Sequence, residues 1–175
     1  MTTLKFNVAQ LLREMLGTRR SYEFREETLP LDETLVLRDI VGRVQFARTK
    51  TGVFAQIRAK GLIRLVCVRS LEEFDYPIEL TIADELHSVI DVLTSAALPK
   101  PIEEDPFFLD HTHQADVGEL IREYTLLELP LNPVCEACQD QFITYSVEST
   151  ANDLELEADH PIDKRLEALK TWKSN

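Results

Sequence analysis

The 175-residue sequence predicts an α+β domain in which an antiparallel sheet, able to close into a barrel, is accompanied by short peripheral helices. Strand-length segments with alternating apolar and polar residues follow one another between positions 41 and 82. The links between them are too short for the helical crossovers that parallel strands need. No apolar stretch approaches the roughly 18 residues of a membrane-spanning helix.

The N-terminal elements are a helix, a strand and a loop. Residues 8–16 have the apolar spacing of a short helix that Asn7 can cap and Gly17 can end. Residues 18–24 alternate as a strand, and residues 26–34, which contain a proline, are expected to form a loop.

A hairpin and two further strands follow. Segments 41–48 and 53–59 flank Thr49-Lys50-Thr51-Gly52, which is typical of a turn whose glycine supplies a positive φ. We expect Gly61 to end the second of these strands. A third strand is then predicted over 62–69 and a fourth over 76–82.

The C-terminal half contains fewer clear signals. A helix is predicted over 87–98, and another begins at Asp116, with Glu119 at capping-box distance. The apolar side of this second helix comprises Val117, Leu120, Ile121, Tyr124 and Leu127. We divide the chain into a core domain over 1–133 and an acidic arm over 134–175, which ends in a short helix over 163–172.

The charge distribution suggests a nucleic-acid-binding surface. The net charge of −12 argues by itself against such binding, but residues 40–71 contain no Asp or Glu. We expect the following residues of this segment to bind RNA, the cations through phosphates and the aromatic ring by stacking: Arg43, Arg48, Lys50, Phe54, Arg58, Lys60, Arg64 and Arg69. The alternative is a solvated face that pairs with the acidic half of the same protein.

Three cysteines in a chain without an export signal indicate reduced thiols and a cytoplasmic protein that needs no cofactor. Cys135 and Cys138 form a single CxxC pair. Zinc is the alternative, with Cys67 as a third ligand and His160 as a fourth, although nothing in the sequence brings these residues together.

Catalytic motifs are weak or missing. His111 and His113 resemble part of a metallo-hydrolase ligand run, but Asp116 in the same segment is better explained as a helix cap. Glycine-rich phosphate loops and a GxSxG nucleophile motif are absent from the sequence. We therefore expect that the protein is not an enzyme.

Several segments together resemble one family. They are Phe6–Leu12 followed by Gly17–Tyr22, Leu65–Phe74, Asp116–Glu123, Leu126–Pro133 with Cys135, and Ile162–Leu169. The family is the bacterial and plastid YceD family, named for large ribosomal RNA subunit accumulation and long described as a domain of unknown function. The sequence departs from the family pattern at Ser70, where a second cysteine is usual, and after Cys138, where a further cysteine pair is usual.

The resemblance implies a non-enzymatic ribosome-biogenesis factor that supports accumulation or processing of 23S ribosomal RNA. Large-subunit RNA is the expected partner, together with ribosomal proteins or RNA-processing enzymes, and no membrane is expected. The alternative is an adaptor whose acidic region over 72–160 docks on a basic ribosomal protein or processing enzyme without touching RNA.

Overall fold

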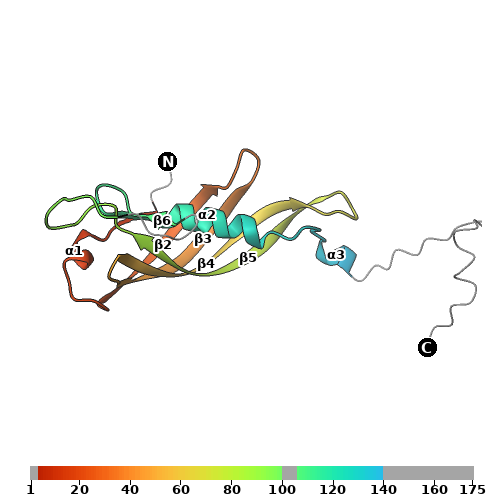
Figure 1. Cartoon of the computed structure of the whole chain (residues 1–175). Coiled ribbons are helices and arrows are strands. Elements are labelled where there is room, and N and C mark those ends of the chain that lie inside the picture. The colour runs from red at the N-terminus through yellow and green to blue at the C-terminus, as the bar shows by residue number, and fades with distance from the viewer. Residues whose placement is uncertain (1–3, 100–105, 140–175) are drawn as a thin grey trace, which may run out of the picture. The chain divides into compact units, whose positions relative to one another are not determined.

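The computed structural model of this chain describes residues 4–99 and 106–139. The elements in chain order are β1 (Lys5–Asn7), α1 (Ala9–Leu12), β2 (Arg19–Pro30), β3 (Val36–Arg48), β4 (Gly52–Val66), β5 (Glu73–His87), β6 (Phe107–Phe108), β7 (Gln114–Asp116), α2 (Val117–Glu128) and α3 (Glu136–Gln139). Figure 1 shows the four long strands as a twisted sheet with α2 lying along one side of it. None of the helices in these two ranges is both long enough and apolar enough to cross a membrane.

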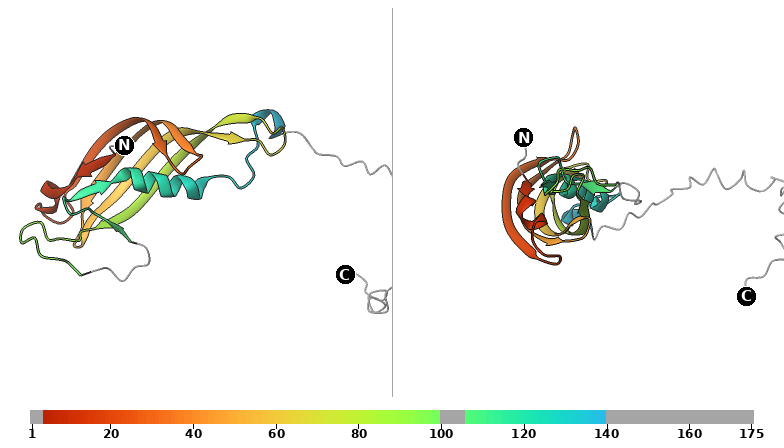
Figure 2. Two further views of the ribbon diagram at one scale, coloured as in Figure 1. Left: turned by 90° about the horizontal axis from the view of Figure 1, so that it is seen from above. Right: turned by 60° about the vertical axis from the view of Figure 1, so that its left-hand side comes forward.

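The five-stranded sheet confirms the predicted α+β class. Its strand order is β2-β3-β4-β5-β6, and neighbouring strands are antiparallel except for the short β5–β6 pair. Within the described residues the sheet stays open, since β2 and β6 form its two edges, so the barrel-like closure allowed by the sequence is not realised. The sheet instead curves around α2 (Figure 2). A separate two-stranded sheet pairs β1 with β7.

The core fills the concave side of this curved sheet. In β4 the inward residues Val53, Ala55, Ile57, Ala59 and Ile63 are all buried. Helix α2 covers them with Val117, Leu120 and Ile121. The same helix is also joined to β5 by the Tyr124 hydroxyl, which donates to an Asp84 carboxylate oxygen at 3.0 Å. Leu127 does not join this side of the helix as predicted, since its side chain is 79% exposed.

The strands are longer than predicted. β2 continues to Pro30 where a loop was expected, and an edge strand tolerates proline because one side of it has no hydrogen-bonding neighbour. Gly61 does not end a strand, because β4 runs through it to Val66. A Cβ atom at Gly61 would lie 3.0 Å from the Arg38 carbonyl oxygen, so this glycine allows close approach of β3.

The turn between β3 and β4 confirms the predicted hairpin but not the role given to its glycine. Gly17 is the one glycine of the described residues with a positive φ, so Gly52 is not left-handed. A Cβ atom at Gly52 would lie 2.0 Å from the Leu86 carbonyl oxygen of β5. Glycine is therefore required here by the neighbouring backbone rather than by the turn geometry.

Two helix predictions were wrong in extent or existence. The N-terminal helix is limited to α1 instead of 8–16, and the apolar Met15 and Leu16 of the predicted range lie beyond it and are exposed. Residues 88–98 form turns and an isolated bridge between Ile90 and Ala97. The Asp91 carboxylate accepts backbone N–H bonds from Leu93 and Thr94, a local alternative to helical hydrogen bonding.

The capped helix was predicted correctly. The Asp116 side chain accepts a hydrogen bond from the Glu119 backbone N–H at 3.1 Å and begins α2. Residues 134–139, assigned by sequence to the arm, contain α3 and contact the turn after β4. The rest of the arm, including the predicted helix over 163–172, lies outside the described residues.

Candidate functional site

The outer, convex face of the sheet carries two unpaired arginines side by side. Arg43 of β3 and Arg58 of β4 are direct cross-strand partners, and both are exposed. Neither forms an ion pair with another described residue. Glu23 of β2 is the cross-strand partner of Arg43 on its other side, but it forms no ion pair with Arg43. The two guanidinium groups can therefore each offer their donors to an external anion.

Sequence reasoning did not include two further arginines of this face. Arg19 and Arg25 lie on the exposed side of β2, and Arg25 pairs in register with Val41 of β3. The alternation of β2, with Tyr22 and Phe24 turned inward, was the signal that could have identified them. We call Arg19, Arg25, Arg43 and Arg58 the cationic face; none of these four is ion-paired to another residue in the ranges 4–99 and 106–139.

Lys60 and Arg64 also point outward but are neutralised by β5. Lys60 pairs with Glu79 at 2.5 Å, and Arg64 pairs with Asp75 at 3.2 Å. Arg38 reaches Asp75 from β3 at 2.5 Å. Hydrogen bonds from Arg64 and then Arg38 hold the pKa of the Asp75 carboxyl below its usual value.

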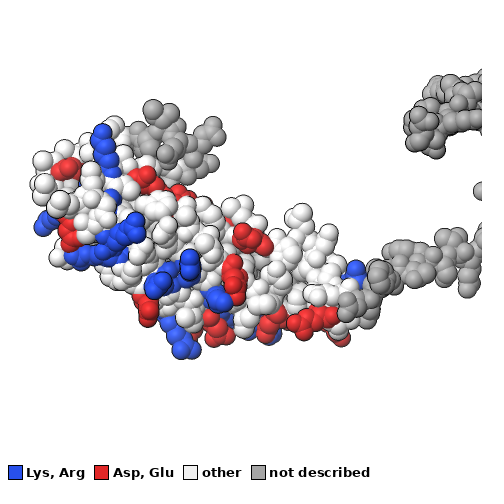
Figure 3. All heavy atoms as spheres, turned by 90° about the horizontal axis from the view of Figure 1, so that it is seen from below, with Lys and Arg blue, Asp and Glu red and all other residues white. Residues whose placement is uncertain are grey.

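Figure 3 shows one face of the molecule on which Lys and Arg predominate at the end away from α3, while Asp and Glu lie among them nearer to it. The acid-free segment therefore divides into an unpaired part and a part neutralised by β5. The sequence did not show this division, because it depends on the cross-strand register of β4 and β5.

Arg48 has an internal structural role. Its guanidinium donates to the carbonyl oxygens of Leu12 at 3.1 Å and Gly52 at 2.8 Å, and also to that of Thr49. Burial lowers the pKa of this side chain from its usual value. These bonds close the β3–β4 turn over α1, so we leave Arg48 out of the proposed binding surface.

The remaining residues of the predicted set lie in different places. Lys50 is exposed in the β3–β4 turn. Phe54 is half-buried on the outer face of β4, between Ala47 and Glu85 on the flanking strands. Arg69 donates to the Cys138 carbonyl oxygen at 2.5 Å, far from the cationic face along β4.

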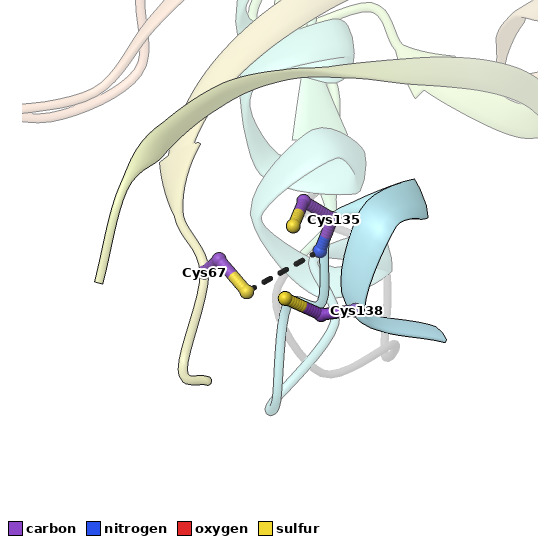
Figure 4. A group of neighbouring side chains, drawn as sticks. All are labelled: Cys67, Cys135 and Cys138. Carbon is purple, nitrogen blue, oxygen red and sulfur yellow. Dashed lines mark hydrogen bonds between the residues drawn. The ribbon is translucent and has the colours of Figure 1, made fainter. Parts of the chain in front are cut away.

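The structure brings the three cysteines together, which the sequence could not show. Their sulfur atoms all lie within 4.8 Å of one another. Cys67 follows β4, and Cys135 and Cys138 lie at the start of α3 and within it. Figure 4 shows the three side chains directed toward a common point. They are free thiols, and they form the one group of at least three metal-ligating side chains found in the described ranges.

Hydrogen bonds distinguish the three thiols. The Ser70 hydroxyl contributes most to lowering the pKa of Cys67 to about 5, together with backbone N–H groups of Ser70, Cys135 and Arg69. Hydrogen bonding to Cys135 is the largest cause of the raised pKa of Cys138, followed by burial. Cys67 therefore ionises before Cys138, and its charge disfavours ionisation of Cys138.

The histidine segment provides no comparable cluster. The Asp110 side chain accepts N–H bonds from Thr112 and Gln114, so residues 110–114 form a turn. His111 and His113 join no group of three metal-ligating side chains among the described residues, and Asp116 caps α2. His160 lies outside the described residues.

Comparisons with known proteins agree with the motifs in the sequence. A family described as "Large ribosomal RNA subunit accumulation protein YceD" matches residues 55–173, more than half of the chain. The chain is 27% identical over 134 residues to a protein of Bacillus subtilis (strain 168) that is named "Uncharacterized protein YlbN", with 70% of each chain covered. No solved structure matches the chain.

Proposed function

The chain belongs to the YceD family, and from this premise we propose that it is a non-enzymatic ribosome-biogenesis factor that binds large-subunit RNA through the cationic face of its sheet. The family description links such proteins to accumulation of large ribosomal RNA. This activity would place the protein in the cytoplasm, where the ribosomal subunits of bacteria assemble.

The observation that carries this proposal is the pairing of Arg43 with Arg58. Like charges that face each other across two strands destabilise a sheet. The described part of the chain offers neither arginine a carboxylate within ion-pair distance, although Lys60 and Arg64 on the same strand have such partners. Glu23, the neighbour of Arg43 on β2, offsets part of this repulsion, and an external polyanion would offset the rest, which suits the arginine pair to binding.

The geometry of the cationic face is suited to a phosphate backbone. Arg19 and Arg25 on β2 add two further cations to this face, on either side of Glu23. Such a surface can contact phosphates spaced along an RNA strand, and Phe54 on the same side of β4 offers a ring on which a base can stack. These contacts bind and position RNA without providing a nucleophile or a general base.

The alternative is an adaptor that uses acidic residues. In β5, the carboxylates of Asp75 and Glu79 are already paired with cations of the same sheet, so they are not free to dock on a basic partner. This observation counts against these two carboxylates as the docking surface, so the adaptor function would depend on the other acidic residues of 72–160.

Crosslinking in growing cells separates the two functions. We expect the wild-type protein to crosslink to 23S ribosomal RNA, with crosslinks at peptides of β3 and β4. The Arg43→Gln/Arg58→Gln variant should lose them while remaining folded. A ribosomal protein or processing enzyme that stays bound after nuclease treatment, with no RNA crosslinks, would support the adaptor instead.

A further inference from the structure

We propose that Cys67, Cys135 and Cys138 form a three-thiolate site for a thiophilic divalent cation, with zinc as the metal that best fits this donor set. The site is independent of the cationic face. Sulfur ligands of one tetrahedral zinc, each about 2.3 Å from the metal, lie about 3.8 Å apart. Since the three sulfur atoms already lie within 4.8 Å of one another, small side-chain rotations bring them to that separation.

Backbone geometry prepares the site for a charged sulfur. The N–H groups of Arg69, Ser70 and Cys135 lie 3.4, 3.5 and 3.4 Å from the Cys67 sulfur. N–H donors directed at a ligand atom orient it and stabilise its negative charge when a metal is bound. Figure 4 shows the bond from the Cys135 backbone, which joins the two segments of the cluster.

The two segments share a three-residue spacing, although their turns are closed by different hydrogen bonds. Cys67 and Ser70 are three residues apart in a turn closed by the Leu71 N–H bond to the Cys67 carbonyl. Cys135 and Cys138 have the same spacing, and the Cys138 N–H donates to the Cys135 carbonyl at 3.0 Å. Pairs of ligands with this spacing are typical of structural zinc sites.

Apolar packing does not account for the burial of these thiols. Cys67 and Cys138 are buried, yet neither belongs to the continuous hydrophobic core of the described residues. At this end of the sheet the apolar side chains of Val66, Val68 and Leu71 are exposed. A bound metal would supply the stabilisation that holds residues 134–139 against the end of β4, as metals do in small modules with little core.

Ser70 lies beside the fourth coordination position. Its hydroxyl oxygen is 3.9 Å from the Cys135 sulfur, and it occupies the place that a fourth cysteine would take in a pair of CxxC turns. A neutral hydroxyl is a poor ligand for zinc compared with a thiolate. The site would therefore hold its metal through three sulfurs and complete the tetrahedron with water or the serine oxygen.

Cobalt titration of the full-length, reduced and chelator-treated protein tests the proposal. We expect one Co²⁺ per chain, with sulfur-to-cobalt charge-transfer absorption and the visible bands of tetrahedral cobalt, both abolished by one equivalent of Zn²⁺. Cys67→Ser removes a ligand and should lower the affinity for cobalt by more than about tenfold, because even substitutions of residues that only hydrogen-bond to the ligands lower metal affinity by about tenfold. Ser70→Cys should tighten binding by at least about tenfold, because a thiolate replaces a neutral donor.

Ser21→Cys is the matched control, since it adds a thiol on the exposed side of β2. It should leave cobalt affinity unchanged. Ser70→Cys removes no ligand, so its result stands even where Cys67→Ser impairs folding. Absence of tetrahedral cobalt absorption with all three thiols reduced, or equal affinities for wild type, Ser70→Cys and Cys67→Ser, would overturn the proposal.

Discussion

Arg43 and Arg58 lie directly opposite each other on β3 and β4, with their side chains on the exposed face of the sheet. Cross-strand pairs change sheet stability by about 0.2–1 kcal/mol, and like charges do so unfavourably. Glu23 of β2 lies opposite Arg43 on its other side and offsets part of this cost, so the unfavourable term is the contact between the two arginines itself.

Replacing one of these arginines by glutamate separates stability from binding. Arg58→Glu places a carboxylate opposite Arg43, so we expect the free energy of unfolding in urea to rise by about 0.2–1 kcal/mol while RNA affinity falls. Arg58→Gln should give an intermediate stability. A loss of stability in both variants would show that Arg58 has a structural partner and would argue against a binding role.

Gly52 is expected to be among the least replaceable residues of the sheet. A Cβ atom there would meet the Leu86 carbonyl oxygen at 2.0 Å, so Gly52→Ala forces β4 and β5 apart and should prevent stable folding. Gly17→Ala is the control: its φ is +84° but no atom lies within 4 Å of the added carbon. Thermal unfolding should show a loss of only about 1–2 kcal/mol for the control.

The helix cap at Asp116 can be tested with a conservative pair of variants. Asp116→Ala removes the acceptor for the Glu119 N–H and should cost about 0.5–2 kcal/mol in urea unfolding. Asp116→Asn keeps a capping oxygen and loses only the exposed ion pair with Lys5, so its stability should stay close to that of the wild type. Equal losses in the two variants would assign the effect to the ion pair.

Asp75 should make the free energy of unfolding depend on pH in the acidic range. Its pKa is lowered in the folded state from the usual 3.8, because Arg64 and Arg38 bind the carboxylate. A carboxyl group whose pKa is lower in the folded state than in the unfolded state stabilises the fold at pH values above its unfolded-state pKa. This stabilisation is lost as the pH falls through the folded-state pKa. In urea unfolding between pH 7 and pH 2, Asp75→Asn should therefore be less stable than wild type at pH 7, and the two curves should converge in acid. A constant difference across this range would contradict the ion-pair account.

Local signals predicted much of the fold. The alternation in β4 and β5 and the Asp116 cap depend on neighbouring residues, and the structure confirms them. The predicted break at Gly61 and the positive φ at Gly52 were wrong because both glycines allow close approach of a neighbouring strand, which a single sequence does not show. Gly52 is approached by the Leu86 carbonyl oxygen, and Gly61 by the side chain of Leu37 and the carbonyl oxygen of Arg38. The predicted helix over 87–98 was wrong because Asp91 satisfies the local N–H groups in a turn.

Contacts between distant segments also decided which of the predicted site residues are available. Seven cations in the acid-free segment were treated as one surface, but the register of β5 neutralises Lys60 and Arg64, and the β3–β4 turn uses Arg48 internally. The cysteine cluster depends on contact between segments about 70 residues apart. Cross-strand register and tertiary contact, rather than residue type, decide which of these groups are available.

The salt dependence of RNA binding is the most direct test of whether Arg43 and Arg58 contact phosphates. Affinity of the full-length protein for transcribed fragments of 23S ribosomal RNA would be measured from 50 to 300 mM salt for the wild type and two double variants. Arg43→Gln/Arg58→Gln should lower affinity at least about tenfold, since a charge-assisted hydrogen bond contributes about 1.5–3 kcal/mol. Its salt slope on a logarithmic scale should fall by about 1.4, the value for two phosphate contacts to a single strand.

Lys60→Gln/Arg64→Gln removes the same charge from ion-paired positions and should have a clearly smaller effect on both quantities. If Arg43 and Arg58 contact the RNA, the two double variants must differ in this way. Equal losses, or unchanged affinity and slope for Arg43→Gln/Arg58→Gln, would show that these two arginines do not bind RNA.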